Sequence, residues 1–527
     1  MSQQIITNII KKQCEILRNF DPEIVQSVQE TLSSVARLLK YTNGVIAFSH
    51  SDYLISLGGT EKVLHQEQNE LAIRGISYIQ IYGISDDPSE YQELPGQRVG
   101  LNIDGVPAGT FTMIQLVLIL AILVEDGRLS ILAAHMHHLM RFHLPGVKFL
   151  LSVIHIERVR IFVHDYYTIC PQFNLLKNGK EFCGGTCTHR DCQFVGEKKS
   201  HFIKMSVLFK DLDFEVIVPS DVAAGIWRKA YPEYGKRVRI VPHLVYKEMP
   251  IKNGKRLQRL ATPTYRPRIA FLGREDFEKG LEAWWRLVSH KELREKYDFF
   301  HLGTAGVRKP GVRYVDVSFL KEGKDAMLKA LREHQIDAVF LWSICQETYS
   351  FTLYESFAES CFVITNPMSG NIAAQIETGS RGAVFDDEQQ LWEAMQDTER
   401  IKSWMVQNLK ENPPLELAFN PMIAEYTEKL KNPDAAAVGD TVDYSVLEKI
   451  DTDMNPLVCM LLVESAKAVK QKQNQAVEIK KVFPISDIRM SPSYQVMNRF
   501  SQYCHKNRAL EMLARKLVNL LFRIMPK

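Results

Sequence analysis

Short apolar runs alternate with amphipathic stretches of about ten to fifteen residues over most of the chain, beginning at Tyr41. In the first half these runs cover residues 44–48, 76–82, 129–134, 159–163, 215–218 and 238–241. Each run is too short for a stable helix and is rich in branched residues, so it is interpreted as a β-strand. The stretches between them are long enough for crossover helices. The pattern predicts an α/β fold with a doubly wound parallel sheet.

The same rhythm restarts after a polar segment, residues 247–267, which reads as a linker. The second set of strand candidates covers residues 268–272, 298–302, 312–317, 338–342, 362–365 and 383–385. We therefore expect two Rossmann-like domains, at 41–246 and at 268–431, facing a cleft that suits a ligand. Residues 1–40 and 432–527 are expected to be helical extensions.

Composition excludes several classes of protein. The 527 residues carry 65 Lys+Arg and 62 Asp+Glu, and this nearly neutral balance predicts no nucleic-acid partner. No apolar run reaches the ~18 residues of a membrane-spanning helix, and the run at 113–124 is expected to be a buried helix. Charged residues near the N-terminus argue against a signal peptide. Nine cysteines do not form a secreted disulfide framework. These features predict a cytoplasmic protein.

Neither sheet carries the Gly-rich motif of a dinucleotide site or a P-loop. Instead, the first strand of the second sheet is followed by Gly-Arg-Glu-Asp-Phe-Glu-Lys-Gly at 273–280. Arg274 can fork onto phosphate oxygens and Lys279 can add a point charge. A solvated charged loop is the alternative interpretation.

A second pattern, two carboxylates eight residues apart, follows the strand at 338–342. Ser350 is a suitable N-cap for a helix through Ala358, which places Glu347 just before the helix and Glu355 inside it. The helix amides of Phe351, Thr352 and Leu353 would then favour an anion. This arrangement suits a phosphate between two hydroxyl-bearing rings, as in a nucleotide sugar.

These motifs resemble the donor site of retaining GT-B glycosyltransferases of family 4, over roughly residues 42–430. Besides Glu347, Glu355, Arg274 and Lys279, the resemblance includes Gly58-Gly59-Thr60-Glu61 and His164-Asp165, the latter followed by Tyr166-Tyr167 and Cys170-Pro171. It implies a GT-B fold and transfer of a sugar from a nucleotide-diphospho-sugar to an acceptor hydroxyl with retention. It also implies work on a bacterial cell-surface polysaccharide or glycolipid precursor, without a catalytic metal.

The resemblance also assigns roles. It implies that domain 41–246 is the acceptor side and that domain 268–431 binds the nucleotide-sugar donor. Glu355 would bind the ribose and Glu347 the transferred sugar, while Arg274, Lys279 and the helix amides would stabilise the departing phosphate. His164 would contact the sugar near the phosphate, and Gly58 and Gly59 would let the backbone approach the donor. His135, His137 and His138 are similar to the family's acceptor-side histidines, although packing is the alternative for each.

The chain departs from the family at two places. Glu359-Ser360-Cys361-Phe362 stands where the family commonly has Ala-Gly-x-Pro, and Ala374 stands where an acidic residue usually follows the Gly-rich loop. A non-catalytic GT-B scaffold, binding a sugar nucleotide or a partner transferase, is therefore the second functional hypothesis.

Two further features leave alternatives open. Cys170, Cys183, Cys187 and Cys192 are close enough in sequence for a structural Zn²⁺ site, or they are reduced cysteines without a metal. The basic amphipathic segment from Lys506 can lie on an anionic membrane, which would place the protein on the inner face of the plasma membrane, or it can pack on the protein.

Overall fold

The computed structural model describes residues 22–84, 97–185, 191–250, 253–431, 458, 460–462 and 464–467. The chain forms two units, residues 1–28 with 451–527 and residues 29–450. In the smaller unit the described residues are the first turns of helix α2 (Pro22–Leu38) and helical residues that include the buried Val458, Leu461 and Leu462. The segment from Lys506, predicted as a basic helix, lies outside the described residues. The features below belong to the larger unit.

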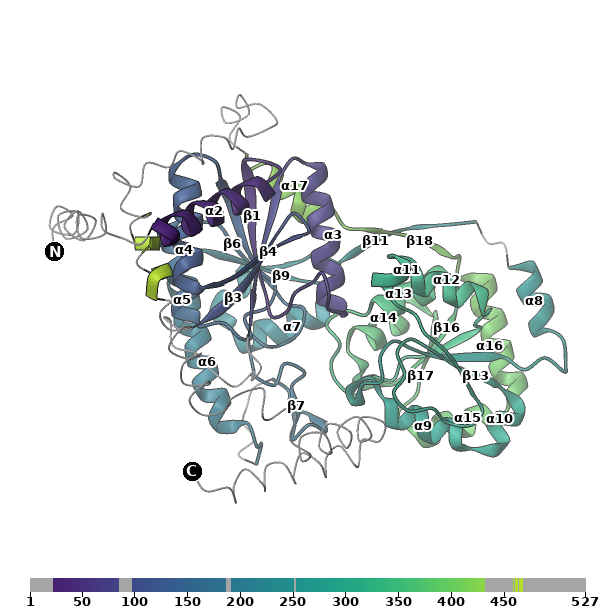
Figure 1. The fold of residues 1–527 in the computed structure, drawn as a ribbon. Coiled ribbons are helices and arrows are strands. Elements are labelled where there is room, and N and C mark those ends of the chain that lie inside the picture. Colours follow the sequence, from purple (N-terminus) through teal and green to yellow (C-terminus); the bar gives the residue numbers. More distant parts are fainter. Residues whose placement is uncertain are drawn as a thin grey trace, which may run out of the picture. The chain divides into compact units, whose positions relative to one another are not determined.

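The first sheet has eight strands in the order β10-β9-β6-β5-β1-β2-β3-β4. The strands are β1 (Asn43–Ser49), β2 (Ser77–Gly83), β3 (Arg98–Ile103), β4 (Val106–Thr112), β5 (Ser130–Met136), β6 (Val159–Phe162), β9 (Phe214–Val218) and β10 (Val238–Ile240). Its helices are α3 (Gly59–Ile73), α4 (Met113–Glu125), α5 (Leu144–Val153), α6 (Val195–Lys210) and α7 (Asp221–Ala230) (Figure 1). The six strands expected from the apolar runs pair in parallel.

Strands β3 and β4 form an antiparallel hairpin at one edge of this sheet, and the apolar runs do not reveal it. β4 is the edge strand and is largely exposed, with Pro107 and Gly109 in its sequence. Such residues are typical of an edge strand rather than of a buried one, which explains the missing apolar signal. The following helix, α4, is buried along most of its length, as expected for the run at 113–124.

The second sheet has six parallel strands in the order β14-β13-β12-β15-β16-β17. They are β12 (Arg268–Leu272), β13 (Asp298–Leu302), β14 (Val312–Val315), β15 (Ala338–Phe340), β16 (Phe362–Thr365) and β17 (Gly382–Val384). The strand order is that of a Rossmann fold, with its switch point between β12 and β15. Two short β-ribbons complete the strands: β7 (Leu176–Lys177) with β8 (Glu181–Phe182), and β11 (Leu244–Glu248) with β18 (Leu415–Phe419).

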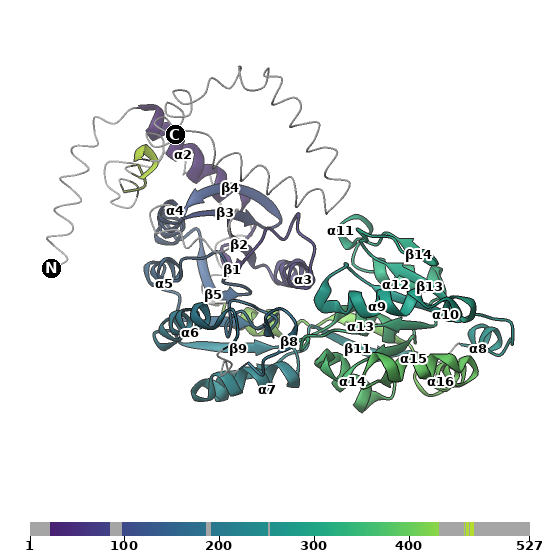
Figure 2. The same ribbon diagram turned by 90° about the horizontal axis from the view of Figure 1, so that it is seen from below.

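Helices cover both faces of the second sheet, because alternate strand residues point to opposite sides. One face packs on α9 (Leu281–Ser289), α10 (Lys291–Lys296), α15 (Glu388–Gln396) and α16 (Thr398–Glu411). The other packs on α12 (Ala326–Glu333), α13 (Phe351–Ala358) and α14 (Asn371–Gly379), and a short helix α11 (Phe319–Glu322) precedes α12 (Figure 2). Trp284 and Leu353 lie at the centres of the two layers, and each is almost fully buried.

The chain passes between the two domains twice, and the two passages are hydrogen-bonded to each other. β11 pairs antiparallel with β18, so that Leu244 lies opposite Phe419. The segment predicted as a linker therefore contains the end of β11 and helix α8 (Gly254–Leu260). After β18, helix α17 (Met422–Glu428) returns to the first sheet, where Ala424 packs with Val45, Ala47 and Tyr78.

The predicted fold class is confirmed: the chain has the two Rossmann-like α/β domains of a GT-B fold. All twelve predicted strands agree with observed ones to within two residues at each end. Among the described residues, none of the helices has both the length and the hydropathy that a bilayer crossing requires.

Candidate functional site

The site lies at the switch point of the second sheet, where the loops after β12 and β15 leave neighbouring strands. Lys279 ends a short 3₁₀ helix, Phe277–Lys279, in the first loop, and Gly280 follows it with φ 80°. A Cβ at Gly280 would come within 2.0 Å of the Trp342 carbonyl oxygen. Glycine is therefore required here on two grounds, and it brings the two loops into backbone contact.

Lys279 and Glu347 form an ion pair across these two loops. Lys279 Nζ lies 2.6 Å from Glu347 Oε1, and the same oxygen accepts a hydrogen bond of 2.9 Å from Ser343 Oγ. The Glu347 side chain is 9% exposed, whereas that of Lys279 is 45% exposed. Desolvation alone would lower the pKa of Lys279, but the Glu347 carboxylate raises it above its ordinary value, so the ammonium stays charged.

The backbone of Glu347 is held by the turn at Gly370. Asn371 N–H donates to the Glu347 carbonyl at 2.9 Å. Gly370 has φ 60° and ψ −121°, and a Cβ there would lie 2.5 Å from the Glu347 nitrogen. This glycine fits directly against the chain that carries the carboxylate.

Helix α13 begins where the sequence predicts it. Ser350 Oγ accepts a hydrogen bond from Leu353 N–H at 3.3 Å, as an N-cap does, and the helix runs through Ala358. The Leu353 amide is therefore engaged in the cap, contrary to its expected role in anion binding. Phe351 and Thr352 contribute the first-turn amides that remain for a ligand.

Glu355 lies inside α13 and is paired with a residue from the first domain. Lys62 Nζ lies 2.6 Å from Glu355 Oε1 and 4.7 Å from the centre of the Phe351 ring. Lys62 is in the first turn of α3, whose first residue, Gly59, is near Phe351: a Cβ on Gly59 would lie 3.9 Å from that ring. A Cβ on the N-cap residue Gly58 would lie 2.3 Å from Glu61 Oε2. The structure thus brings the predicted Gly58-Gly59 turn to the start of α13.

Sequence reasoning did not identify Lys62. It directly follows Glu61 of the Gly-Gly-x-Glu motif, but a lysine in the first turn of a helix ordinarily belongs to a solvated face. Only its hydrogen bond to Glu355, which is 293 residues away in the sequence, identifies Lys62 as a site residue.

His164 also meets the loop before α13. Its carbonyl oxygen accepts a hydrogen bond of 2.5 Å from Thr348 Oγ1, and the Thr348 carbonyl accepts one of 2.7 Å from Ser220 Oγ. Burial, together with the neighbouring His137 and His243, places the pKa of His164 well below its ordinary value, so its ring is neutral. The first domain thus contributes the His164 carbonyl to the loop between Glu347 and α13, while the neutral His164 ring lies against His137 and His243.

Arg274 is not joined to this group by any contact in the described part of the chain. Its Nε bonds both carboxylate oxygens of Asp276 on its own loop, at 3.0 and 2.9 Å, and its side chain is 68% exposed. The predicted pairing of Arg274 with Lys279 around one phosphate is not among these contacts, and Arg274 uses only its Nε for Asp276.

His135 near the end of β5, and His137 and His138 directly after it, are all buried and have carboxylate partners. His138 Nε2 lies 3.0 Å from Asp165 Oδ2, and its Nδ1 accepts from Met140 N–H. His135 and His137 both contact Glu67 on α3. They are thus parts of the polar interior next to His164.

Three of the four clustered cysteines line one small cavity. Cys170, Cys183 and Cys192 surround it together with Lys177 and Lys198, while Cys187 lies outside the described residues. Thiols are suitable ligands for Zn²⁺, but the three described sulfur atoms do not all lie within 4.8 Å of one another. Zinc at these four cysteines stays a prediction.

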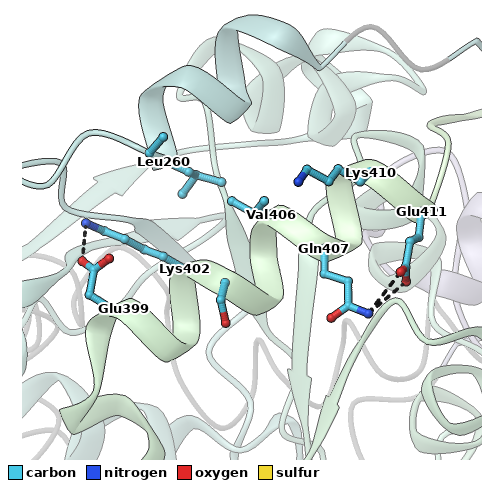
Figure 3. Close-up of a pocket in the computed structure, with 9 residues that line it drawn as sticks. Leu260, Glu399, Lys402, Val406, Gln407, Lys410 and Glu411 are labelled. Atoms are coloured by element: carbon cyan, nitrogen blue, oxygen red, sulfur yellow. Dashed lines mark hydrogen bonds and ion pairs between the residues drawn. The ribbon is translucent and has the colours of Figure 1, made fainter.

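A separate hollow of about 470 Å³ lies between α8 and α16 (Figure 3). Arg259 of α8 bonds Asp337, directly before β15, so this hollow is at the amino ends of the strands, away from the switch point. Part of its lining is paired internally: Lys402 bonds Glu399, and Gln407 bonds Glu411. Lys410, which also lines the hollow, has no such partner in the described part of the chain.

No protein-family model matches the sequence, and no curated protein is detectably similar to it. Several solved structures are similar in fold. Sucrose-phosphate synthase from Thermosynechococcus elongatus is 13% identical with a TM-score of 0.45, over 74% of this chain and 98% of that one. A glycosyltransferase from Rickettsia africae is 12% identical (TM-score 0.43; 76% and 100% covered). The catalytic domain of starch synthase IV from Arabidopsis thaliana, bound to ADP and acarbose, is 12% identical (TM-score 0.42; 74% and 98% covered).

Proposed function

We propose that this protein is a retaining glycosyltransferase, which moves a sugar from a nucleotide-diphospho-sugar to an acceptor hydroxyl. The observation that carries the proposal is the pair of carboxylates around the start of α13. Glu347 lies before the helix and Glu355 inside it, and each is paired with a lysine at 2.6 Å. Between them the helix presents its positive end. This is a site for an anion whose two ends carry hydroxyl groups.

The charges at this site suit a diphosphate as a leaving group. As the bond between the sugar carbon and the phosphate oxygen breaks, negative charge grows on the phosphate. Lys279 and the amides of Phe351 and Thr352 are fixed before the reaction and can receive that charge, each such contact contributing ~10²–10³ in rate. Lys62 adds a second cation from the opposite domain. Arg274 would join them through its Nη groups, since Asp276 engages only its Nε.

The lysines leave part of each carboxylate for the ligand. Glu347 and Glu355 both use Oε1 for their lysine, so Oε2 is the atom that can accept from a hydroxyl. In this assignment Glu355 binds the ribose and Glu347 binds the transferred sugar. His164 reaches that sugar from the first domain.

Retention follows from a front-face route, in which the departing phosphate oxygen takes the proton of the attacking hydroxyl. The new bond then forms on the face from which the phosphate leaves, and no enzymic nucleophile is needed. No catalytic metal is required either, because lysines and amides supply the positive charge. The acceptor is proposed to be a bacterial surface polysaccharide or glycolipid precursor on the cytoplasmic side, on the strength of the motif resemblance.

Ser360, in the segment that departs from the family, follows α13 with φ 51°, a left-handed conformation that glycine adopts without strain. The retained carboxylates Glu347 and Glu355, each paired with a lysine, support a working donor site over a drifted scaffold.

Binding and turnover test the proposal separately. Melting of the full chain should be measured with a panel of nucleotide sugars, since a ligand at 100-fold over its Kd adds ~2.7 kcal/mol of stability. The ligand that stabilises should then be used as donor with lipid-linked and free glycan acceptors, and the new linkage examined by NMR. Binding without transfer would identify a scaffold instead, and an inverted linkage would exclude the retaining route.

A further inference from the structure

A buried chain of hydrogen bonds leads from Glu67 on α3 to His164 at the proposed site. Glu67 Oε2 lies 2.8 Å from His137 Nε2, and His137 Nδ1 lies 2.9 Å from His164 Nε2. Glu67 is 3% exposed and His137 is 1% exposed. Because each imidazole in such a chain has one proton and one lone pair when neutral, the partners of the first group decide the protonated atom of the last.

The hydrogen bonds that fix the protons on these groups begin one step before Glu67, at the guanidinium of Arg160. Arg160 Nη1 lies 3.0 Å from His135 Nε2, and a guanidinium can only donate. His135 Nε2 must therefore carry the lone pair, which places the proton on Nδ1. From there it is donated to Glu67 Oε1 at 2.9 Å.

Glu67 is the acceptor on which the rest depends. It receives hydrogen bonds from His135, from His137 and, at 2.9 Å, from the hydroxyl of Tyr78. Burial by itself would raise the pKa of Glu67, but His135 and His137 lower it well below the ordinary value. An ionised Glu67 can only accept, so His137 carries its proton on Nε2.

A His137 ring that carries its single proton on Nε2 has its lone pair on Nδ1, whereas a doubly protonated ring would have none. His164 Nε2, 2.9 Å away, must then be the donor. The neutral ring of His164 is left with its lone pair on Nδ1.

We infer that Glu67 and His137 are positioning residues, which fix His164 as its Nε2–H tautomer so that His164 Nδ1 accepts a hydrogen bond from a hydroxyl of the transferred sugar. The inference about the substrate rests on the proposed function. This tautomer divides the roles at the site, because the lone pair on His164 Nδ1 repels phosphate oxygens. His164 would select a hydroxyl-bearing sugar, while the lysines and the helix stabilise the phosphate.

A metal ion is the competing explanation, since ligand atoms of Glu67, His135 and His137 lie within 4.8 Å of one another. An ion there would displace the hydrogen bonds between these groups. It would also lie close to the guanidinium of Arg160, which contacts His135. Charge and existing partners therefore favour the hydrogen-bonded chain.

Long-range ¹H–¹⁵N NMR of the full chain, labelled at histidine, reads the tautomers directly. Wild-type protein should show His164 protonated on Nε2 and His137 protonated on Nε2. A proton on His164 Nδ1 would overturn the inference without any mutation. Shifts of the His135 and His137 signals on addition of Zn²⁺ or Mn²⁺ would also overturn it, in favour of a metal site.

Glu67→Gln should reverse the donor and acceptor roles in the hydrogen bonds from residue 67 through His137 to His164. Arg160 still requires the Gln oxygen to face His135, so the Gln amide N–H₂ faces His137 Nε2. His137 must then move its proton to Nδ1, and His164 must move its own from Nε2 to Nδ1. Tyr78→Phe is the matched control, because it removes a hydrogen bond to the same carboxylate and leaves every tautomer unchanged.

Turnover completes the test. Glu67→Gln should lower kcat/KM by about tenfold to a hundredfold, because a protonated His164 Nδ1 would face the hydroxyl that it otherwise accepts from. The kcat/KM of Tyr78→Phe should stay within about threefold of the wild-type value. A reversed tautomer with unchanged turnover would overturn the role at the sugar. If wild-type protein transfers no sugar at all, the proposed function fails, and the NMR result still decides whether Glu67 and His137 set His164.

Discussion

Lys62 and Glu355 are 293 residues apart in the sequence, and their side chains form a 2.6 Å ion pair between the two Rossmann-like domains. Both are largely buried, with side-chain exposures of 16% and 6%. Lys279 and Glu347 repeat this pairing within the second domain. The carboxylates proposed to bind the donor are therefore charge-balanced before it arrives. Donor binding exchanges one set of polar contacts for another.

The phosphate clamp can be tested at Lys279. Lys279→Ala should reduce kcat/KM by at least ~100-fold, because it removes a preorganised charge from the leaving group. Lys329→Ala is a suitable control, since Lys329 is an exposed lysine of α12 paired with Glu333. Near-wild-type kinetics of a folded Lys279→Ala protein would remove this residue from the site.

Glu355→Gln should weaken nucleotide diphosphate and nucleotide sugar alike. Ribose does not change in the reaction, so its contact contributes uniform binding. Isothermal titration with both ligands measures the effect. Weakened nucleotide sugar with unaffected nucleotide diphosphate would contradict a ribose contact.

Glu347→Gln should have the complementary effect. Affinity for free nucleotide diphosphate should stay nearly unchanged, while turnover falls and the preference among donor sugars alters, because Glu347 is assigned to the transferred sugar. Competition assays with a series of sugar nucleotides measure the preference. Equal loss of nucleotide diphosphate affinity in both variants would break the division of roles.

Gly370→Ala should destabilise the fold by about 2 kcal/mol or more and reduce turnover. The new Cβ would stand 2.5 Å from the Glu347 nitrogen at a positive φ. Gly379 is the last residue of helix α14, which begins directly after Gly370, and it has open space around it. Gly379→Ala should therefore be neutral or stabilising by up to ~1 kcal/mol. Chemical denaturation of both variants gives the comparison, and equal stability would contradict the close fit at Gly370.

Stability should fall as the solution is acidified from pH ~6.5 to 4. Burial lowers the pKa of His201 to about 4, against an ordinary value of 6.5. Its Nε2 faces the Tyr167 carbonyl and its buried Nδ1 has no partner among the described residues. Between these pH values the unfolded chain binds the proton and the folded chain does not. This residue then contributes a slope of up to ~1.4 kcal/mol per pH unit. Unfolding free energies against pH should show a shallower slope in His201→Gln, and parallel curves would contradict the assignment.

The cysteine cavity predicts one equivalent of zinc in purified protein, and chelation should lower its melting temperature. Cys183→Ser and Cys192→Ser should lose the metal. Cys361→Ala, a buried thiol of the second domain, should retain it. Metal-free protein with four alkylatable thiols at 170, 183, 187 and 192 and unchanged melting would exclude the site.

Local signals explain what could be predicted from the sequence. The Ser350 cap and the end of α13 at Ala358 depend on residues within one helix, and both were predicted correctly. The occupied Leu353 amide was not anticipated, because the cap and the anion site compete for the same donor. The β3–β4 hairpin was missed because an edge strand with Pro107 and Gly109 lacks an apolar run.

Long-range pairing explains the rest. The sequence does not reveal β11 as a strand: its last two residues, Lys247 and Glu248, are polar and fall in the predicted linker, and the strand forms by pairing with β18, about 170 residues later. The roles of Lys62 and Glu67 likewise depend on residues brought close by the fold. In the sequence, Glu67 resembles any polar residue on the solvated face of a helix. Only the positions of His135 and His137 make it a buried acceptor.

The return of α17 to the first sheet has a consequence for biosynthesis. Ala424 fills part of the core beneath β1 and β2, and Thr427 Oγ1 accepts a hydrogen bond of 2.6 Å from Arg160 in β6. A ribosome makes these residues only after the whole second domain. The domain that is translated first is therefore the last to be completed, and a nascent chain that stops before α17 exposes the apolar surface around Val45 and Tyr78 to water.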